Sequence, residues 1–324
     1  MKQKRLLSML VLLVAVVSGA WAQDPATYKI TLAEGTEDAE NWTVPAEAAA
    51  GSPVTATYSG AKKVKSVKAV KKGGAVDNTY LKWDADQKKL VATDIPAEVT
   101  MVANANQDVN WAAGTYVVDG EVTISGIIKL NGNVDLIIKD GAKLTVNNKI
   151  VGYDNGKKLS IYGQANQTGE VVVNYSGQAI TNVTTLEVHS AKVKATSSAN
   201  SYSGFYYIQT FNVYGGLVDA ENTAAKGGYG ISLASSGSMN IYGGDVKALG
   251  KGNKFGIRGS NSTITVYGGK LWAECAGNKA ISGDATLTKG AGFTGKIETS
   301  ADNSAWTEYT DAATPETKYV RVGY

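Results

Sequence analysis

The chain has 324 residues, and its 32 Lys and Arg against 29 Asp and Glu give a formal net charge of +3. Three basic residues, Lys2, Lys4 and Arg5, precede an apolar N-terminal run, so the rest of the chain is neutral, with 29 basic against 29 acidic residues. Neutrality removes the electrostatic reason to expect nucleic acid or an anionic membrane surface as a partner. Cys275 and His189 are the only Cys and His, so neither an internal disulfide nor a zinc site is expected, and no cofactor is predicted.

Residues 1–22 have the form of a secretory signal peptide. The three basic residues precede the apolar run from Leu6 to Val17, and Ala20-Trp21-Ala22 is a small-x-small cleavage site. The run is too short for a membrane span, and no later run is long enough. We therefore expect an exported chain that begins at Gln23, without a transmembrane segment, in the periplasm, on the outer-membrane surface or outside the cell.

Residues 23–105 predict a small β-sandwich, Ig-like in the loose sense. Apolar and polar residues alternate from Tyr28 to Leu32 and from Val54 to Tyr58, at the period of a half-buried strand, and Gly and Pro punctuate these runs. The lysine run from Lys62 to Lys72 indicates a solvated edge strand, with an anionic-polymer patch as the alternative. Asp84-Ala85-Asp86 indicates a turn, because the further spaced ligands of a calcium loop are missing.

A repeated pattern occupies residues 106–324. Phe-Asn-Val-Tyr-Gly-Gly begins at Phe211, Met-Asn-Ile-Tyr-Gly-Gly at Met239 and Ile-Thr-Val-Tyr-Gly-Gly at Ile264, while Leu159 begins a shorter copy and His189 replaces the Tyr in another. We align Leu136–Lys139 and Ala285–Thr288 as worn end copies. The central residues are then 21 to 28 apart, the spacing of a solenoid turn. The aligned row is Ile138, Ile161, Val188, Val213, Ile241, Val266 and Leu287.

Two further strands complete each predicted coil. One is marked by Leu144, Val171, Val193, Val218, Val246, Leu271 and Ile297, followed two residues later by Val146, Val173, Ala195, Ala220, Ala248, Ala273 and Thr299. The other is marked by Ile180, Ile208, Ile231, Ile257 and Ile281. Three strands per coil with in-register stacking predict an all-β chain with a parallel β-helix of about seven coils, capped by residues 291–324.

Parallel β-helices are frequent among polysaccharide lyases and glycoside hydrolases, so an enzyme is the first alternative. Such sites need clustered carboxylates. The outward residues of the second strand instead alternate in charge, as in Lys194, Asp219 and Lys247, which indicates cross-strand pairing. We predict no catalytic residue, and the best enzyme candidates are Asp219 and Asp245. His189 is expected to be a variant of the repeat, and Cys275 a buried small apolar residue.

Aromatic residues recur at two positions of the coil and are the candidate ligand-binding residues. Those at the Tyr position should face outward as a ladder, with Trp272 one strand away, and a second row should lie at another corner. Exposed aromatic rows suit stacking on sugar rings or a protein partner; the alternative, which we favour for any single row, is that the rings stack on one another and fill the corners. The candidates are Tyr162, Tyr214, Tyr242, Tyr267, Trp272, Tyr206 and Tyr229.

Two stretches resemble exported proteins of gut and oral Bacteroidetes. Tyr28–Trp42 with Thr57–Val67 resembles their N-terminal module, and the Ile-Tyr-Gly-Gly coils are similar to right-handed β-helix repeats, some labelled carbohydrate-binding. The resemblance implies a Gram-negative envelope or secreted setting and no catalytic motif. We expect a non-catalytic glycan-binding or adhesin-like protein whose partner is a polysaccharide, a host glycan or another surface protein. A polysaccharide-cleaving β-helix enzyme and a structural spacer are the alternatives.

Overall fold

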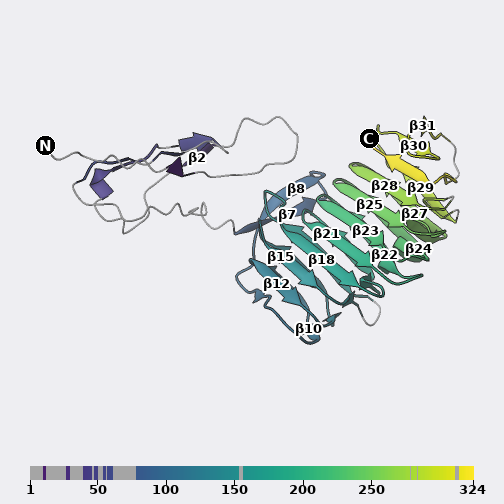
Figure 1. Cartoon of the computed structure of the whole chain (residues 1–324), viewed down its shortest axis with the longest axis horizontal. Coiled ribbons are helices and arrows are strands. Elements are labelled where there is room, and N and C mark those ends of the chain that lie inside the picture. Colours follow the sequence, from purple (N-terminus) through teal and green to yellow (C-terminus); the bar gives the residue numbers. More distant parts are fainter. Residues whose placement is uncertain are drawn as a thin grey trace. The chain divides into compact units, whose positions relative to one another are not determined.

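The computed structural model describes residues 78–324 except 153–155, 278, 283 and 311–313, and in the N-terminal part residues 10–11, 27–29, 39–45, 47–49, 54–55 and 57–60. The chain divides into two compact units, Met1–Val76 and Asp77–Tyr324 (Figure 1). Each unit is considered by itself below.

The first unit has short elements in its described residues. Three two-stranded antiparallel sheets are formed by the pairs β1–β5, β2–β4 and β3–β6, and the one described helix is a 3-10 turn. The bounds are β1 (Leu10–Val11), β2 (Thr27–Lys29), η1 (Ala39–Asn41), β3 (Trp42–Thr43), β4 (Glu47–Ala49), β5 (Val54–Thr55) and β6 (Thr57–Tyr58). The Ig-like sandwich stays a prediction, and the lysine run at residues 62–72 lies outside the described residues.

The second unit is a parallel β-solenoid of about seven coils, as predicted (Figure 1). Each coil contributes one strand to each of three faces, which we call the first, second and third face. The first face contains β9 (Thr100–Met101), β11 (Gly114–Val118), β14 (Val134–Ile138), β17 (Lys158–Gly163), β20 (Thr185–Val188), the ends of β22 (Ser203–Val213) and β24 (Tyr229–Ile241), β27 (Ser262–Val266) and β29 (Ala285–Lys289).

The other two faces follow the first in chain order. The second face contains β12 (Glu121–Ile124), β15 (Lys143–Val146), β18 (Glu170–Tyr175), β21 (Lys192–Ser197), β23 (Leu217–Asn222), β25 (Asp245–Gly250) and β28 (Lys270–Cys275). The third face contains β10 (Val109–Trp111), β13 (Ile128–Leu130), β16 (Ile150–Val151), β19 (Ile180–Thr181), the starts of β22 and β24, and β26 (Ile257–Ser260).

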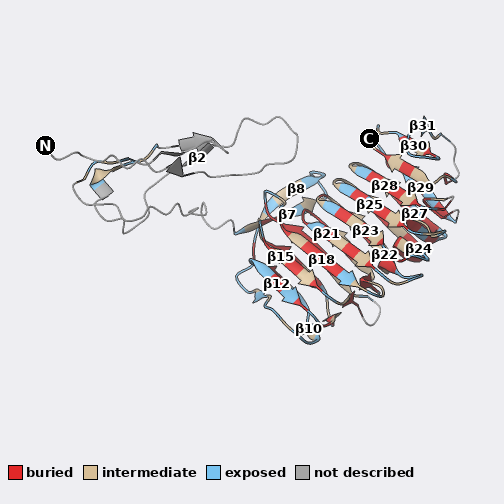
Figure 2. Ribbon diagram, in the orientation of Figure 1, coloured by how far each residue is buried: buried red, intermediate tan, exposed pale blue. Residues whose placement is uncertain are grey.

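The inward residues of the three faces form one continuous core, and buried residues alternate with more exposed ones along the strands (Figure 2). Val188, Val213 and Ile241 of the first face stack in register and are fully buried. Burial of each such side chain stabilises the fold by about 1.5–3 kcal/mol. Cys275 is also buried, as predicted from its place two residues after Ala273.

Glycine closes the turn from the first face to the second. Gly216, Gly244 and Gly269 have φ of 72°, 74° and 72°, in the left-handed region that non-Gly residues rarely adopt. A Cβ on Gly244 would lie 2.6 Å from the carbonyl carbon of Gly215 and from the carbonyl oxygen of Gly216. The Gly therefore serves both the turn and the close stacking of successive coils.

The predicted alignment was wrong by two residues at both ends of the first face. Ile161 lies opposite Leu136, where Ile138 was expected, and Leu287 lies opposite Ile264, where Val266 was expected. A shift of two leaves every side chain on its own face, so the alternation of apolar residues cannot detect it. The end copies lack the Tyr-Gly marker that fixed the register of the central coils.

The third-face alignment was wrong at β22. Phe205, not Ile208, lies between Ile180 and Ile231 in the stack. Tyr207 has φ of 57°, and the register of β22 against β24 shifts on both sides of Ile208. This irregularity adds residues to the coil, and it moves Tyr206 opposite Ser232 rather than in line with Tyr229.

The C-terminal segment pairs antiparallel with the last strand of the second face, whereas the sequence alignment had placed Ile297 and Thr299 as a further parallel rung. β32 (Tyr319–Val322) pairs antiparallel with β28, as a strand added to the last coil, and then with β30 (Ile297–Ser300), which pairs with β31 (Thr307–Glu308). Ile297 and Thr299 therefore do not stack on β28 as a further rung. β32 lies between β28 and β30, and an alignment of repeats cannot detect it because it does not follow the repeat.

A hairpin precedes the solenoid in chain order and belongs to the same compact unit. β7 (Thr79–Asp84) and β8 (Lys89–Asp94) pair antiparallel around the turn that was predicted at Asp84-Ala85-Asp86, where Asp84 Oδ1 accepts hydrogen bonds from the backbone N–H groups of Asp86 (2.9 Å) and Gln87 (2.8 Å). The compact unit thus begins well before the domain boundary expected between residues 105 and 106.

Candidate functional site

The predicted ladder lies on the outer side of the first face as a continuous stack of rings. Centroid separations are 4.4 Å from Tyr162 to His189, 4.7 Å from His189 to Tyr214, 5.1 Å from Tyr214 to Tyr242 and 4.8 Å from Tyr242 to Tyr267. Interplanar angles between 6° and 26° mean that the rings face one another along the solenoid axis. Their faces are therefore occupied within the stack, which is the packing arrangement considered above.

The β7–β8 hairpin covers the start of this ladder. Tyr80 meets Tyr162 edge-on at 4.7 Å, and Trp83 lies 5.2 Å from Tyr214 and 5.6 Å from Tyr242. A second small core joins Tyr80 and Ile95 to Val117, Ile137 and Tyr162, which are outward residues of β11, β14 and β17. Exposure consequently rises along the ladder, from 2% at Tyr162 to 40% at Tyr267.

Three hydrogen bonds fix the hairpin backbone to the coils beneath it. The N–H of Trp83 donates to His189 Nδ1 (3.0 Å), Gln164 Nε2 donates to the carbonyl of Thr79 (2.9 Å), and Ser190 Oγ donates to the carbonyl of Leu81 (3.2 Å). His189, Gln164 and Ser190 are all buried. The side chains that break the repeat at His189 therefore serve to hold the hairpin.

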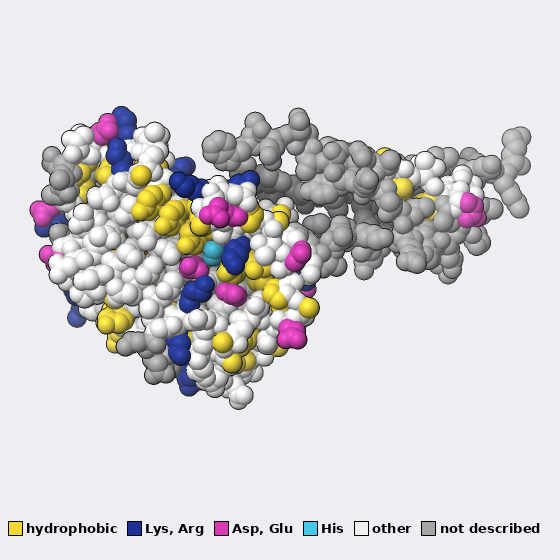
Figure 3. All heavy atoms as spheres, turned by 180° about the vertical axis from the view of Figure 1, so that it is seen from behind, with side chains coloured by type: hydrophobic (Ala, Val, Ile, Leu, Met, Phe, Trp, Pro, Cys, Tyr) yellow, Lys and Arg dark blue, Asp and Glu magenta, His cyan; other side chains and the backbone are white. Residues whose placement is uncertain are grey.

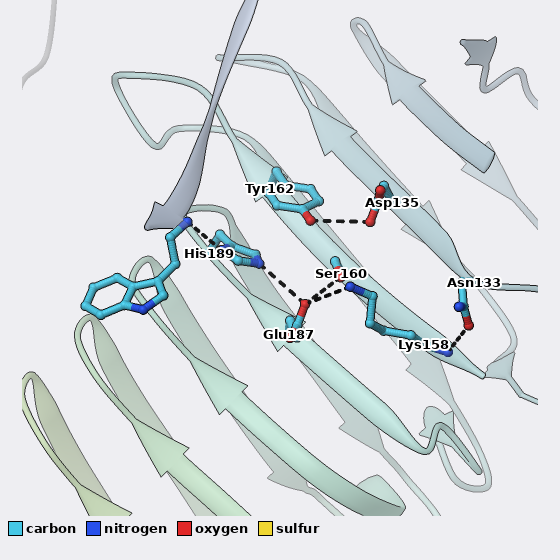
Figure 4. Close-up of polar contacts among 8 residues, drawn as sticks. Asn133, Asp135, Lys158, Ser160, Tyr162, Glu187 and His189 are labelled. Carbon is cyan, nitrogen blue, oxygen red and sulfur yellow. Dashed lines mark hydrogen bonds and ion pairs between the residues drawn. The ribbon is translucent and has the colours of Figure 1, made fainter. Parts of the chain in front are cut away.

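A charged cluster lies beside the covered part of the ladder (Figure 4). Glu187 Oε2 accepts hydrogen bonds from Ser160 Oγ (2.8 Å) and Lys158 Nζ (3.3 Å) and lies 3.7 Å from His189 Nε2. Tyr162 Oη donates to Asp135 Oδ1 at 3.3 Å. Figure 3 shows hydrophobic side chains on this face of the molecule, with acidic and basic side chains gathered next to them.

The cluster holds Glu187 ionised and His189 neutral. Burial by itself would raise the pKa of Glu187, but the nearby His189, the hydrogen bond from Ser160 and the charge of Lys158 outweigh it and lower the pKa to about 2. Burial lowers the pKa of His189, and the neighbouring Glu187 only partly offsets this. A neutral imidazole with Nδ1 as acceptor is the form that the Trp83 N–H requires.

Ser160, Glu187 and His189 contain the residue types of a catalytic triad but not its connectivity. A nucleophilic Ser needs a base within hydrogen-bond reach of its hydroxyl. The Ser160 hydroxyl donates to the carboxylate of Glu187, and His189 Nδ1 is occupied by the hairpin. Ser160 is also fully buried. The arrangement is that of an anchor for the hairpin.

Asp219 and Asp245 lie on neighbouring strands of the second face among basic residues. Asp219 is opposite Lys194 and Lys247, with 3.4 Å between its Oδ2 and Lys194 Nζ, and Asp245 is opposite Lys270. Lys143 and Glu170 pair in the same way at 3.0 Å. The predicted cross-strand charge pairing is thus present on this face.

The remaining predicted site residues lie in three separate places. Trp272 lies on the outer side of the second face within an aromatic group, 5.3 Å from Trp306, 6.3 Å from Tyr319 and 6.0 Å from Tyr324. Tyr229 stacks on Phe255 at 6.1 Å, with Arg258 over its ring. Tyr206 is not in that row and contacts Tyr207 instead.

Two polar rows that sequence reasoning missed run beside the ladder on the first face. They lie two and four residues before the aromatic row, so the same repeat spacing could have revealed them. From β22 onward neither row contains a charged residue. The nearer row is Asn212, Asn240, Thr265 and Thr288, and the farther row is Thr210, Ser238, Thr263 and Thr286.

Comparison with known proteins places this chain in no group. No protein family, curated protein or solved structure matches it. Within the described residues, no group of three or more His, Cys, Asp and Glu side chains is arranged to hold a metal ion, and no helix is long and apolar enough to cross a membrane.

Proposed function

We propose that the protein binds an extended polysaccharide without cleaving it, through the outer side of the first face from β22 to β29. The observation that supports this is a set of three parallel rows: the Tyr row, which reaches past the hairpin at Tyr267, then the Asn and Thr row, then the Ser and Thr row. Amides and hydroxyls both donate and accept hydrogen bonds, as sugar hydroxyls do. We call this area the uncharged surface.

The repeat gives the uncharged surface a regular spacing. Parallel strands lie about 4.8 Å apart, so a ligand chain running along the solenoid axis meets the same kind of group once per coil. Asn240 Nδ2 donates to Asn212 Oδ1 at 3.0 Å, and the hydroxyls of Thr265 and Thr288 are 3.4 Å apart. These contacts keep the rows ordered before a ligand arrives, which lowers the entropic cost of binding.

Sugar stacking on this surface is assigned to the open end of the ladder. The inner rings cover one another, whereas Tyr267 is 40% exposed and the next rung has Gly290, whose Cβ position would be only 2.1 Å from the Tyr267 ring. No side chain at Gly290 therefore covers Tyr267. An export setting on a Gram-negative cell, expected from the N-terminal residues, is part of the same proposal.

Binding of the full chain to an array of plant and host polysaccharides tests the proposal. The double variant Thr265→Val, Thr288→Val removes two hydroxyls with little change of shape, and Tyr267→Ala removes the end ring. Each should weaken polysaccharide binding by about tenfold or more, equivalent to about 1.4 kcal/mol. Thr145→Val on the second face and the exposed Tyr202→Ala are the matched controls.

The assay also separates the other functions considered. Release of new reducing ends from a bound polysaccharide would show that the protein is a polysaccharide-cleaving enzyme and would overturn the proposal. Saturable binding that is equally strong in all four variants would place the site elsewhere. No binding to any polysaccharide by any of the proteins would reject glycan binding and leave a spacer or a protein-binding surface.

A further inference from the structure

A pocket of ≈ 350 Å³ opens at the opposite end of the second-face strands from the Tyr-Gly-Gly turns. It spans three successive coils, where β15, β18 and β21 end and the chain turns toward the third face. Its lining residues are Asn147, Asn174, Tyr175, Ser176, Thr196 and Ser198. This volume is at the small end of the range of ligand pockets, about 300–1,000 Å³.

The polar side chains that line this pocket make no hydrogen bonds with the rest of the described chain. Within the described part of the chain, none of the six lining side chains donates or accepts a hydrogen bond, in contrast to the paired Asn and Thr rows of the uncharged surface. Thr196 Oγ1 is fully buried without a partner. Asn148 Oδ1 and Ser197 Oγ, which neighbour lining residues in the chain, are buried and unpaired as well.

Unpaired buried polar atoms are rare in folded proteins, and each one calls for a physical reason. The three at this corner are closed off from solvent and do not reach a ligand directly. The donors and acceptors that are open to the hollow are those of the exposed Asn147, Asn174, Ser176 and Ser198, and a ligand can pair with them. Stacking of the coils does not require polar side chains at this corner, because apolar residues can fill the same position in a solenoid.

Tyr175 supplies the single aromatic surface of the pocket. Part of its side chain packs against the main core, which fixes the position of the ring. A Cβ on Gly177 would lie 2.7 Å from the ring, so the ring rests on backbone and no side chain at Gly177 crowds it. A fixed ring bordered by amides and hydroxyls presents one apolar surface and a polar rim.

From this geometry we infer that the pocket binds one uncharged sugar ring, such as a hexose or an N-acetylhexosamine. Such a ligand has an apolar C–H face for Tyr175 and hydroxyls for Asn147, Asn174 and Ser198. No lining side chain is a carboxylate or a base, so neither a charged sugar nor a phosphate finds a counter-ion among the lining residues. The pocket is separate from the uncharged surface and does not depend on polysaccharide binding there.

Calorimetric titration of the full chain with glucose, galactose, mannose and N-acetylglucosamine tests the inference, with uridine as an uncharged ring that is not a hexose. At least one sugar should bind saturably. Ser198→Ala and Asn174→Ala, both at exposed positions, should each weaken that binding at least about fivefold, and Tyr175→Ala at least about tenfold. Thr145→Val and Tyr202→Ala should leave it unchanged.

Several outcomes overturn the inference. Failure of every sugar to saturate, equal binding in the three pocket variants, or uridine binding as tightly as the best sugar would each do so. This test is independent of the test of polysaccharide binding. The pocket variants should still bind polysaccharide, whereas the double variant Thr265→Val, Thr288→Val should lose polysaccharide binding and still bind the single sugar.

Discussion

The backbone N–H of Trp83 donates a 3.0 Å hydrogen bond to Nδ1 of His189, joining the hairpin to the second ring of the aromatic stack. The bond exists only while Nδ1 carries a lone pair, so the imidazole must be neutral with its proton on Nε2. Nε2 in turn lies 3.7 Å from Glu187, too far for a hydrogen bond. The hairpin is therefore docked on a titratable group that must stay neutral, and burial lowers the pKa of His189 from its usual value.

His189 should make the stability of the second unit fall below neutral pH. Its folded pKa is lowered from the usual 6.5 by burial, so the unfolded chain takes up the proton first. Stability is complete above about pH 7 and decreases as the pH falls through 6.5. The charged groups facing His189 are Glu187, Lys158 and Lys82, and the two lysines also oppose protonation. Urea unfolding between pH 8 and pH 5 measures the decrease.

His189→Phe is the matching variant for that measurement. It keeps a ring in the stack but leaves the Trp83 N–H without its acceptor, which costs about 1–3 kcal/mol at pH 8. Its stability should be nearly constant from pH 8 to pH 5.5. Parallel curves for the original protein and His189→Phe would show that the pH dependence arises elsewhere.

Glu187 should produce a second loss of stability at lower pH. Its folded pKa of about 2 lies below the usual 4.5, so the stabilisation is present above pH 4.5 and is lost as the pH falls from 4.5 toward 2. Since one pKa unit corresponds to about 1.36 kcal/mol, the full effect is about 3 kcal/mol. Thermal unfolding of Glu187→Gln should show the loss at pH 7 and little further change down to pH 3; a wild-type-like acid response would contradict this.

The core rows predict opposite effects for two substitutions on different faces of the solenoid. Val213 is fully buried in the stack between Val188 and Ile241, so Val213→Asp places a carboxylate in the core and should prevent folding. Lys247 is exposed on the second face, so Lys247→Ala should change stability by less than about 0.5 kcal/mol. Circular dichroism melting curves that coincide for the two variants would refute the inward assignment.

The central coils were predictable because each carries its own marker. The Tyr-Gly-Gly triplet fixes register and face together, and the row through Val213, Ile241 and Val266 follows from it. Toward the ends the marker is lost, and only alternation remains. Alternation determines the face but not the register, which is why Ile138 and Leu287 were placed two residues from their true partners.

Features that occur only once in the chain could not be predicted from the repeat. Tyr80 and Trp83 occur once, so nothing in their spacing indicates that they pack on Tyr162 and Tyr214, far along the chain. The pocket at Tyr175 likewise depends on three coils meeting at a corner.

Removal of the Trp83 ring should loosen the hairpin without unfolding the coils. Trp83 is half-buried between the hairpin and the Tyr214–Tyr242 part of the ladder, so Trp83→Ala should cost about 2 kcal/mol, less than a fully buried Trp. Limited proteolysis should then cut within residues 79–94 at least about tenfold faster. Lys82→Ala, at an exposed position on the same strand, is the control and should be cut at the original rate.

Two glycines with the same backbone conformation separate turn strain from coil packing. Gly141 has φ of 76° with nothing within 4 Å of its Cβ position, so Gly141→Ala should cost only the left-handed strain, about 1 kcal/mol. Gly244 has φ of 74°, and its Cβ would lie 2.6 Å from backbone atoms of Gly215 and Gly216 on the preceding coil. Backbone cannot move aside as a side chain can, so Gly244→Ala must separate two coils and should cost several times more. Urea unfolding of the two variants side by side measures the difference; equal losses would mean that the close stacking at the Tyr-Gly-Gly turn contributes nothing beyond the turn itself.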